Sequence, residues 1–315
     1  MNKKFDVLTF GDLCVDLIVS GPDVVPEFGQ KEKLVEGYSL EMGGSCSIFA
    51  CQAAKLGLKT AVVGRVGNDQ FGALIRETLK DAGVYIGYIL TDRSLNTGIS
   101  ISLNTVDDRA ILTYNGTIDA LSLEDADDEL LKSVRHLHIG SFYLMKRLQP
   151  HFHVIARKIK EYGGTVSLDT NWDPDEKWDG GIWDVIPYVD IIFPNENEAM
   201  AITGRSTVRE AIEQLKSIIP VVAVKKGRYG AEVYAHGNTY RVPAIDAEKK
   251  DAVGAGDSFD GGFIYGFLSG KDIEECIKIG CICGSLNIRE YGGTRGQPGF
   301  DELIRYLAAP YERKV

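Results

Sequence analysis

The sequence predicts an α/β fold in which helices flank both faces of a doubly wound and mostly parallel sheet. Short apolar runs of strand length recur along the chain, segments with helical spacing separate them, and glycines often mark the joints. Strands that alternate with helices favour parallel pairing, because each crossover helix packs onto a face of the sheet. The pattern contains no long linker, so residues 1–315 are expected to form a single domain.

The first elements are expected to form a βαβ unit. The run Phe5–Asp16 is typical of a strand, Ser45–Leu56 has helical spacing and ends before Gly57, and Thr60–Gly64 is typical of a buried strand. The same alternation continues downstream, with strands expected at His136–Ile139, Thr165–Leu168, Ile191–Phe193 and Val221–Val224, and helices at Phe152–Tyr162 and Thr207–Ser217.

Two segments break this rhythm, at about residues 17–41 and 97–116, and together predict a small β-strand lid. In the second segment, Ile99–Leu103 and Arg109–Tyr114 alternate apolar and polar residues around a turn at residues 107–108. A flap of this kind beside a ligand site excludes water when it closes. Its exposed strand edge also favours a homodimer that forms through the lid.

The composition excludes several classes of partner. The formal net charge is -10 at pH 7, which disfavours nonspecific binding to nucleic acid or to an anionic membrane surface. No apolar stretch is long enough to span a membrane, and the start of the chain lacks a secretory apolar region. The six cysteines contain no paired CxxC set, so we expect them to be reduced and mostly buried. These features predict a cytoplasmic protein that binds a small molecule.

The segment Asp251–Asp257 carries the strongest chemical signal. Its sequence is Asp-Ala-Val-Gly-Ala-Gly-Asp, and it precedes a helical run, Ser258–Ser269, that ends at Gly270. Small residues at a helix start let backbone N–H groups approach an anion, and the helix dipole favours negative charge there. Phosphoryl transfer needs such donors, together with a carboxylate that takes a proton from the attacking hydroxyl. Asp257 suits that role, and the alternative is that it only caps the helix.

Two separate segments resemble the signatures of the ribokinase-like, or PfkB, family of carbohydrate kinases. Asp251–Asp257 is similar to the C-terminal signature of the family, with Ala252 in place of the usual threonine. Gly43–Gly72 is similar to the N-terminal signature, with its glycines in family order. The resemblance extends from the first strand to about Pro298. It implies a ribokinase-like fold and a kinase that uses ATP and Mg²⁺.

The resemblance implies a role for each residue that matches a family motif. The residues implied to bind substrate hydroxyls are Asp16, Gly43 and Gly44, those of the anion hole are Gly254, Ala255 and Gly256, and the base, which also contacts the substrate, is Asp257. The residues implied at the nucleotide are Asn195, Lys225, Gly227 and Gly230, with Glu198 holding Mg²⁺ through water and Asp251 near a monovalent cation such as K⁺.

Three of these residues keep a second interpretation. Asn195 and Glu198 follow a proline and are also favoured at an ordinary helix start. Lys225 stands in place of the usual threonine, and it either reaches a phosphate or lies in solvent. Whether the protein depends on K⁺ also stays open.

Three departures from the family pattern leave the substrate undetermined. Asp169–Pro174 resembles the family element Asp-x-Asn-x-Arg-Pro, but Asp173 stands in place of the arginine. If Asp173 faces the pocket, it repels an acidic substrate and favours a neutral polyol. Ile48 and Cys281 occupy the places of asparagines that lie near substrate and near adenine in many members. Both replacements remove hydrogen-bonding capacity.

The expected function is transfer of the ATP γ-phosphate to a hydroxyl of a small sugar or polyol, of the ribose, fructose or inositol kind. A nucleoside kinase is the alternative among enzymes, because Ile48, Phe142 and Tyr143 would make the pocket more apolar. A sugar- or nucleotide-binding protein that lost turnover is a further alternative from a different class. The sequence names neither the substrate nor the hydroxyl that is phosphorylated.

Overall fold

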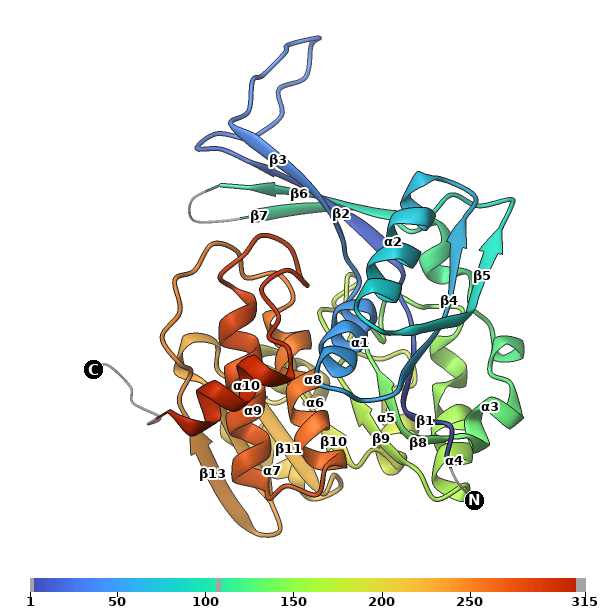
Figure 1. Ribbon diagram of the computed structural model, residues 1–315, viewed down its shortest axis with the longest axis vertical. Helices are drawn as coiled ribbons and strands as arrows, with labels where there is room; N and C mark the ends of the chain where they lie inside the picture. The colour runs from blue at the N-terminus through green and yellow to red at the C-terminus, as the bar shows by residue number, and fades with distance from the viewer. Residues whose placement is uncertain (1–2, 106–108, 310–315) are drawn as a thin grey trace.

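The computed structural model describes residues 3–105 and 109–309. Two β-sheets organise this part of the chain (Figure 1). Among the described residues, the main sheet has nine strands in the order β13-β12-β11-β10-β9-β8-β1-β4-β5, and the second sheet has four in the order β3-β2-β6-β7. The strands of the main sheet are β1 (Phe5–Phe10), β4 (Thr60–Gly67), β5 (Tyr85–Asp92), β8 (Val134–Ile139), β9 (Thr165–Leu168), β10 (Ile191–Ile192), β11 (Val221–Lys225), β12 (Ala231–Ala235) and β13 (Asn238–Val242).

The main sheet is mostly parallel. Every pair of neighbouring strands from β11 to β5 is parallel, and β12 and β13 add an antiparallel edge beside β11. Each parallel step requires a crossover connection, which the helices supply. The predicted doubly wound α/β fold is therefore confirmed.

Helices cover both faces of the main sheet. Their bounds are α1 (Ser45–Lys55), α2 (Gln70–Asp81), α3 (Asp128–Lys132), α4 (Phe152–Glu161), α5 (Ile182–Val185), α6 (Glu196–Thr203), α7 (Val208–Lys216), α8 (Ala255–Leu268), α9 (Ile273–Asn287) and α10 (Phe300–Ala308). Val222 and Val224 of β11 lie in the core formed with α4, α6 and α7, whereas Val221 and Ala223 lie in the core formed with α1, α8 and α9. Successive residues of a strand point to opposite faces, so an apolar run without alternation suits a strand buried on both sides.

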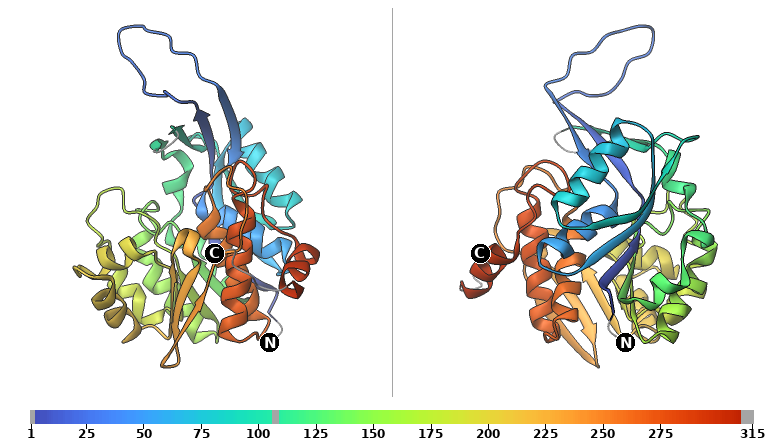
Figure 2. Two further views of the ribbon diagram at one scale, coloured as in Figure 1. Left: turned by 90° about the vertical axis from the view of Figure 1, so that its left-hand side faces the viewer. Right: turned by 45° about the vertical axis from the view of Figure 1, so that its right-hand side comes forward.

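The second sheet contains β2 (Cys14–Ser20), β3 (Gly37–Met42), β6 (Gly98–Asn104) and β7 (Arg109–Tyr114). β2 pairs parallel with β6, and the two outer pairs are antiparallel. The sheet rises from the body of the protein, and the segment between β2 and β3 extends furthest from it (Figure 2). The strands expected on each side of residues 107–108 are present as β6 and β7, and the turn itself lies outside the described residues.

One expected strand is two strands. Phe5–Asp16 does not form a single element, because β1 ends at Phe10 and β2 begins at Cys14 in the other sheet. Between them, the Asp12 carboxylate accepts hydrogen bonds from the first backbone amides of α1. The Asp12 side chain thus binds the start of α1. Between Phe10 and Cys14, the chain leaves the main sheet and enters the second sheet.

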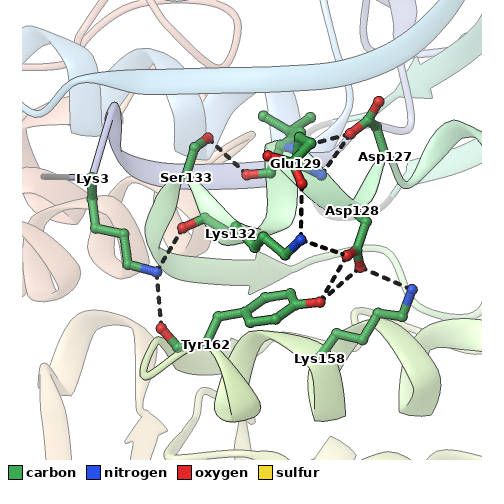
Figure 3. Close-up of polar contacts among 9 residues, drawn as sticks. Lys3, Asp127, Asp128, Glu129, Lys132, Ser133, Lys158 and Tyr162 are labelled. Atoms are coloured by element: carbon green, nitrogen blue, oxygen red, sulfur yellow. Dashed lines mark hydrogen bonds and ion pairs between the residues drawn. The ribbon is translucent and has the colours of Figure 1, made fainter. Parts of the chain in front are cut away.

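A polar network fixes the edge of the main sheet where β1, β8 and β9 begin (Figure 3). Lys3 Nζ donates to the carbonyl oxygens of Lys132 and Tyr162, at 2.8 and 2.9 Å. The Tyr162 hydroxyl donates to the Asp128 carboxylate, which also pairs with Lys158 at 3.0 Å. The network joins the start of the chain to α3 and to the end of α4, at the edge opposite the carboxyl ends of these strands.

Two further observations concern the cysteines and the helices. All six cysteines are buried. No helix within residues 3–105 and 109–309 is both long and apolar enough to cross a membrane.

Candidate active site

Lys225, a predicted site residue, and two aspartates that were not predicted as site residues lie where strands of the main sheet end. Asp12 follows β1, Asp169 follows β9, and Lys225 ends β11. The start of α8 lies at the same edge, since a Cβ atom at Gly256 would be 3.3 Å from Lys225 Nζ. In open α/β sheets, ligands bind at this carboxyl edge.

Helix α8 begins earlier than expected, at Ala255 instead of Ser258. Gly254 is its N-cap in a left-handed conformation with φ of 72°, and no side chain caps the helix. Asp257 therefore lies inside the first turn, which corrects the alternative that it only caps the helix. N–H groups in the first turn have no intrahelical acceptor, so those of Gly254 and Gly256 can donate to an anion. The Ala255 amide makes a long hydrogen bond, at 3.4 Å, to the Ala252 carbonyl oxygen.

Asp257 has a raised pKa, at about 7. Burial is the largest cause, the negative charge of Asp169 raises the pKa further, and the positive charge of Lys225 partly opposes both. A carboxylate with a pKa near 7 binds a proton more strongly than an ordinary one and is still ionised at slightly alkaline pH. Such a carboxyl group can take up a proton near neutral pH.

Lys225 does not lie free in solvent, which was one of its two interpretations. Its ammonium lies 2.6 Å from Asp169 Oδ2 and 3.5 Å from Asp260 Oδ2, and its side chain is 16% exposed. Burial alone would lower the pKa of Lys225, but Asp169, Asp260 and Glu198 raise it overall. Lys225 is therefore a fixed positive charge beside Asp257.

Asp16, Gly43 and Gly44 lie together where the second sheet meets α1. Asp16 belongs to β2, and the glycine pair joins β3 to α1. A Cβ atom at Gly43 would overlap the Asp16 carboxylate, and one at Gly44 would overlap the Asp12 carbonyl oxygen. Gly44 also has a φ of 84°. Glycine is needed at both positions, and the Asp16 carboxylate packs directly against the chain.

A hydrogen-bond network beside Asp257 was not predicted. Asp12 accepts from the Ser141 hydroxyl at 2.5 Å and from the first backbone amides of α1 at 3.0 Å. The Asn171 amide donates to the hydroxyls of Ser45 and Ser141. The Ser45 hydroxyl in turn hydrogen-bonds to Asp257 and lowers its pKa. Asn171 belongs to the element that resembles the family motif, whereas nothing in the sequence pointed to Ser141.

Asn195 and Glu198 form a capping box at the start of α6. Asn195 Oδ1 accepts from the Glu198 backbone amide at 2.9 Å, and Glu198 Oε2 accepts from the Asn195 amide at 2.8 Å. The helix-start interpretation is thus correct for both residues. Glu198 is also buried near Asp169, and both effects raise its pKa. A cation nearby would stabilise the ionised Glu198, which fits a metal ion bound through water.

The side chains near Glu198 suit a hydrated metal ion. Within the described residues, no group of three or more His, Cys, Asp or Glu side chains is arranged to hold a metal. Mg²⁺ keeps several waters and commonly binds through one carboxylate and substrate phosphates. Glu198 can supply that carboxylate through water, and no dedicated cage is needed.

A cavity of about 760 Å³ lies beside the first turn of α8. The expected nucleotide residues Lys225, Gly227 and Gly230 line it together with Ala255 and Gly256, whereas Asn195 does not. This volume is in the range of small-molecule and cofactor sites. Three of the four expected nucleotide residues therefore line one cavity together with the first turn of α8.

Asp251 joins two loops at the mouth of the site. Its Oδ1 accepts from the Val253 amide at 3.1 Å, and its Oδ2 accepts from the Gly292 amide at 3.0 Å. Asp251 also lines a second cavity of about 910 Å³, which the second sheet borders through Ile18, Ser39 and other residues. It holds the loop before α8 against the loop after α9.

Comparison with known proteins assigns this arrangement to a family. The profile of the pfkB family carbohydrate kinases matches residues 4–298. The chain belongs to this family. Among relatives of this pfkB kinase, an ATP-dependent ribose-1-phosphate kinase from Halopiger xanaduensis is 30% identical over 276 residues, which cover 86% of this chain and 88% of the relative. A 5-dehydro-2-deoxygluconokinase from Geobacillus thermodenitrificans is 26% identical over 323 residues, which cover 97% and 94%.

A solved structure supports the fold of this pfkB kinase. A protein from E. coli, described as a ribokinase II and solved with ATP and Mg²⁺, superposes with a TM-score of 0.83 at 25% identity. The match covers 96% of this chain and 99% of that one. The ribokinase-like fold expected from the sequence is confirmed.

Two departures from the family pattern have structural roles in this pfkB kinase. The Asp173 carboxylate accepts from the backbone amides of Asp175, Lys177 and Trp178, at 2.7 to 3.0 Å. It stabilises its own loop, and Asp173 is not among the residues that line the two cavities described above. Ile48 is 2% exposed, and its side chain fills the space beside Gly254 and Gly293. It packs beneath the anion-hole turn.

Proposed function

We propose that this pfkB kinase transfers the γ-phosphate of ATP to a hydroxyl of a small sugar or polyol, with Asp257 as the base. One observation carries the proposal. Asp257 lies between the expected nucleotide side and the expected substrate side of the site. Ala255 and Gly256 of the same turn line the nucleotide-sized cavity, and Ser45 of the polar network contacts Asp257. A base at that boundary can reach a hydroxyl on one side while the phosphate lies on the other.

The proposed reaction is an in-line displacement. The substrate hydroxyl gives its proton to Asp257, its oxygen bonds to the γ-phosphorus, and the bond from that phosphorus to the oxygen of ADP breaks. The amides of Gly254, Ala255 and Gly256 stabilise the negative charge that develops on the transferred group. Glu198 and Asn195 would hold hydrated Mg²⁺, which would supply positive charge to the phosphate oxygens when bound.

The substrate side of the site suits hydroxyl groups. Asp12 and Asp16 are hydrogen-bond acceptors, and Asn171, Ser45 and Ser141 complete a polar wall beside the base. Carboxylates accept hydrogen bonds from hydroxyl groups and repel anionic substituents. These groups support a neutral substrate, and nucleosides are the competing class that an experiment must separate from sugars and polyols.

The second sheet is proposed to act as the lid, formed from about residues 17–41 and 97–116 of a single domain. Arg295 pairs with Glu41 of β3 at 2.8 Å and so joins this sheet to the loop after α9. The lid also exposes Tyr38, Ile111 and Leu112, which are 78%, 52% and 63% exposed. Apolar residues on a sheet with open edges support a homodimer through the lid. An enzyme that consumes ATP is expected in the cytoplasm.

The test is ADP release with Mg·ATP against a panel of ketoses, aldoses, inositols, deoxy-keto acids, sugar phosphates and nucleosides. Asp257→Asn is assayed in parallel, with Asp127→Asn as the control, because Asp127 caps the distant helix α3 and asparagine caps equally well. A neutral sugar or polyol that responds, and that Asp257→Asn abolishes, supports the proposal. A response to nucleosides alone, or full activity in Asp257→Asn, contradicts it. Repeating the assay in KCl and in NaCl tests the K⁺ requirement attributed to Asp251.

A further inference from the structure

Lys225 occupies a position that the proposed mechanism leaves unexplained. It ends β11, and its ammonium lies against the first turn of α8, where a Cβ atom at Gly256 would be 3.3 Å away. It also lines the nucleotide cavity. The charge of Lys225 lowers the pKa of Asp257, so the two groups interact electrostatically. A positive charge therefore stands where the base, the anion hole and the nucleotide cavity meet.

Asp260 is a partner of this lysine that no sequence motif indicated. It lies one turn beyond Asp257 on α8 and is 0% exposed. Its Oδ2 lies 3.5 Å from Lys225 Nζ, and its Oδ1 has no hydrogen-bond partner within the described part of the chain. A buried carboxyl group with an unmet oxygen is destabilising unless a nearby group compensates. Such a cost is commonly retained at functional sites.

We propose that Lys225 binds the phosphoryl group in transit, and that Asp169 and Asp260 hold its ammonium at the anion-hole turn. Lys225 is then a catalytic residue, and the two aspartates are positioning residues. The inference rests on the proposed kinase function, because it assigns the residue that receives the charge of the transferred group.

The donor count of the lysine supports this role. An ammonium has three N–H donors, and Asp169 and Asp260 occupy two of them at most. At least one donor stays available to a phosphate oxygen in the cavity. During transfer, negative charge spreads over the equatorial oxygens of the phosphoryl group, and a fixed cation in a site closed to water stabilises it strongly.

The carboxylates also explain how a buried lysine keeps its charge. Burial would lower the pKa of Lys225, and the negative charges of Asp169, Asp260 and Glu198 raise it instead. The short contact with Asp169, at 2.6 Å, fixes the direction of the side chain. A lysine without these partners would be free to rotate away from the first turn of α8.

Nucleotide binding tests the role of Lys225 without any sugar substrate. Isothermal titration compares Mg·ADP with the magnesium complex of the non-hydrolysable ATP analogue AMP-PNP. In Lys225→Met, we expect the affinity for AMP-PNP to fall about tenfold or more, and that for ADP to change less than about twofold, because a charge-assisted hydrogen bond to the terminal phosphate is lost. An equal loss for both nucleotides, or no loss, overturns the inference.

Lys226→Met is the matched control. Lys226 is the neighbouring residue, it pairs with Glu232 at 2.8 Å, and it is not among the residues that line the nucleotide cavity. We expect it to bind both nucleotides as the unmodified protein does. A loss of AMP-PNP affinity in this control would mean that the general charge of the region, and not Lys225, discriminates the terminal phosphate.

Two substitutions at Asp260 test positioning. Asparagine at position 260 keeps the size of the side chain and an oxygen that can accept a hydrogen bond from Lys225, which lies 3.5 Å from Asp260 Oδ2. In Asp260→Asn, the ratio of the affinities for AMP-PNP and ADP should stay within about twofold of that in the unmodified protein. In Asp260→Leu, this ratio should fall about tenfold, because leucine accepts no hydrogen bond. Thermal unfolding checks that each variant is folded.

Asp169→Asn covers the case in which Asp260→Leu does not fold. It keeps the volume of the side chain and removes the charge nearest to Lys225, so the preference for AMP-PNP should fall. Retention of the full preference in Asp169→Asn and in any folded Asp260→Leu overturns the positioning role. The proposed function fails separately: no phosphorylated product from the substrate panel, together with the expected loss in Lys225→Met, would leave a nucleotide-binding site without sugar kinase activity.

Discussion

The Asp16 carboxylate occupies the space that a side chain at Gly43 would need. Gly43→Ala must therefore displace Asp16 from its place beside the chain. We expect the KM for the sugar to rise about tenfold or more, because one charge-assisted hydrogen bond to the substrate is lost. The KM for ATP should change little. Gly37→Ala is the control, since a Cβ there meets its nearest atom at an ordinary 3.4 Å, and a similar rise in that variant would contradict the argument.

Gly254→Ala should damage the anion hole. Gly254 has a φ of 72°, and a Cβ there would lie 2.8 Å from Gly293 Cα and 2.9 Å from the Ile48 side chain. Relief of this overlap must move the first turn of α8, and loss of aligned donors commonly lowers kcat about 100-fold. Gly270→Ala is a matched control, because Gly270 has a φ of 74° but no atom within 4 Å of its Cβ position. Steady-state kinetics should show a loss of kcat in the first variant alone.

Asp169→Asn should shift the pH dependence of the reaction. The pKa of Asp257 is about 7, and the negative charge of Asp169 is among the causes that raise it. Removal of that charge lowers the pKa, so the base is ionised at more acidic pH. We expect the acidic limb of the kcat/KM profile to move down by about one pH unit. A profile that keeps its acidic limb near pH 7 would show that Asp169 does not act on the base.

Asp257→Asn should make the ligand-free protein more stable than the unmodified protein, and this difference should grow as pH rises. The folded pKa of Asp257, about 7, exceeds its ordinary value of 3.8, so the folded chain holds a proton that the unfolded chain has released. The stability that this proton provides is present below about pH 4 and is lost as pH rises through 7. Asparagine does not titrate and so causes no such loss. Calorimetry at pH 5, 6, 7 and 8 should show that the Tm of Asp257→Asn exceeds that of the unmodified protein by a margin that grows to about 2 °C or more. A difference independent of pH would contradict the raised pKa.

Leu112→Asp should weaken a dimer formed through the lid. Leu112 is 63% exposed on β7, at an edge of the second sheet. A charge there opposes burial in an apolar interface, and we expect sedimentation velocity to show monomers in place of dimers. Ile218→Asp is the control, because Ile218 is 46% exposed but follows α7, away from the second sheet. Monomers in the unmodified protein at all concentrations would refute the lid dimer.

Much of the fold and of the reaction chemistry could be predicted from local patterns. The apolar run Thr165–Leu168 coincides with strand β9. A strand buried on both faces needs no alternation of apolar and polar residues, so the apolar run alone indicated its bounds. Asp251–Asp257 indicated a phosphate site because its small residues precede a helical run. The errors were also local: β1 and β2 were joined, and α8 was started at Ser258, because the left-handed conformation of Gly254 is not visible in the sequence.

By itself, the sequence determined the class of fold and the family, and it predicted Asp257 as the base. Only the tertiary structure decided what surrounds that base. Lys225 contacts Asp169 across 56 positions of sequence, and Ser141 contacts Asp12 across 129. The physical reason is that such contacts depend on which strands lie side by side in the sheet, and residue periodicity carries information only about neighbours within an element. Asp173 illustrates the same limit, because its residue type does not reveal that its carboxylate accepts hydrogen bonds from the backbone amides of its own loop.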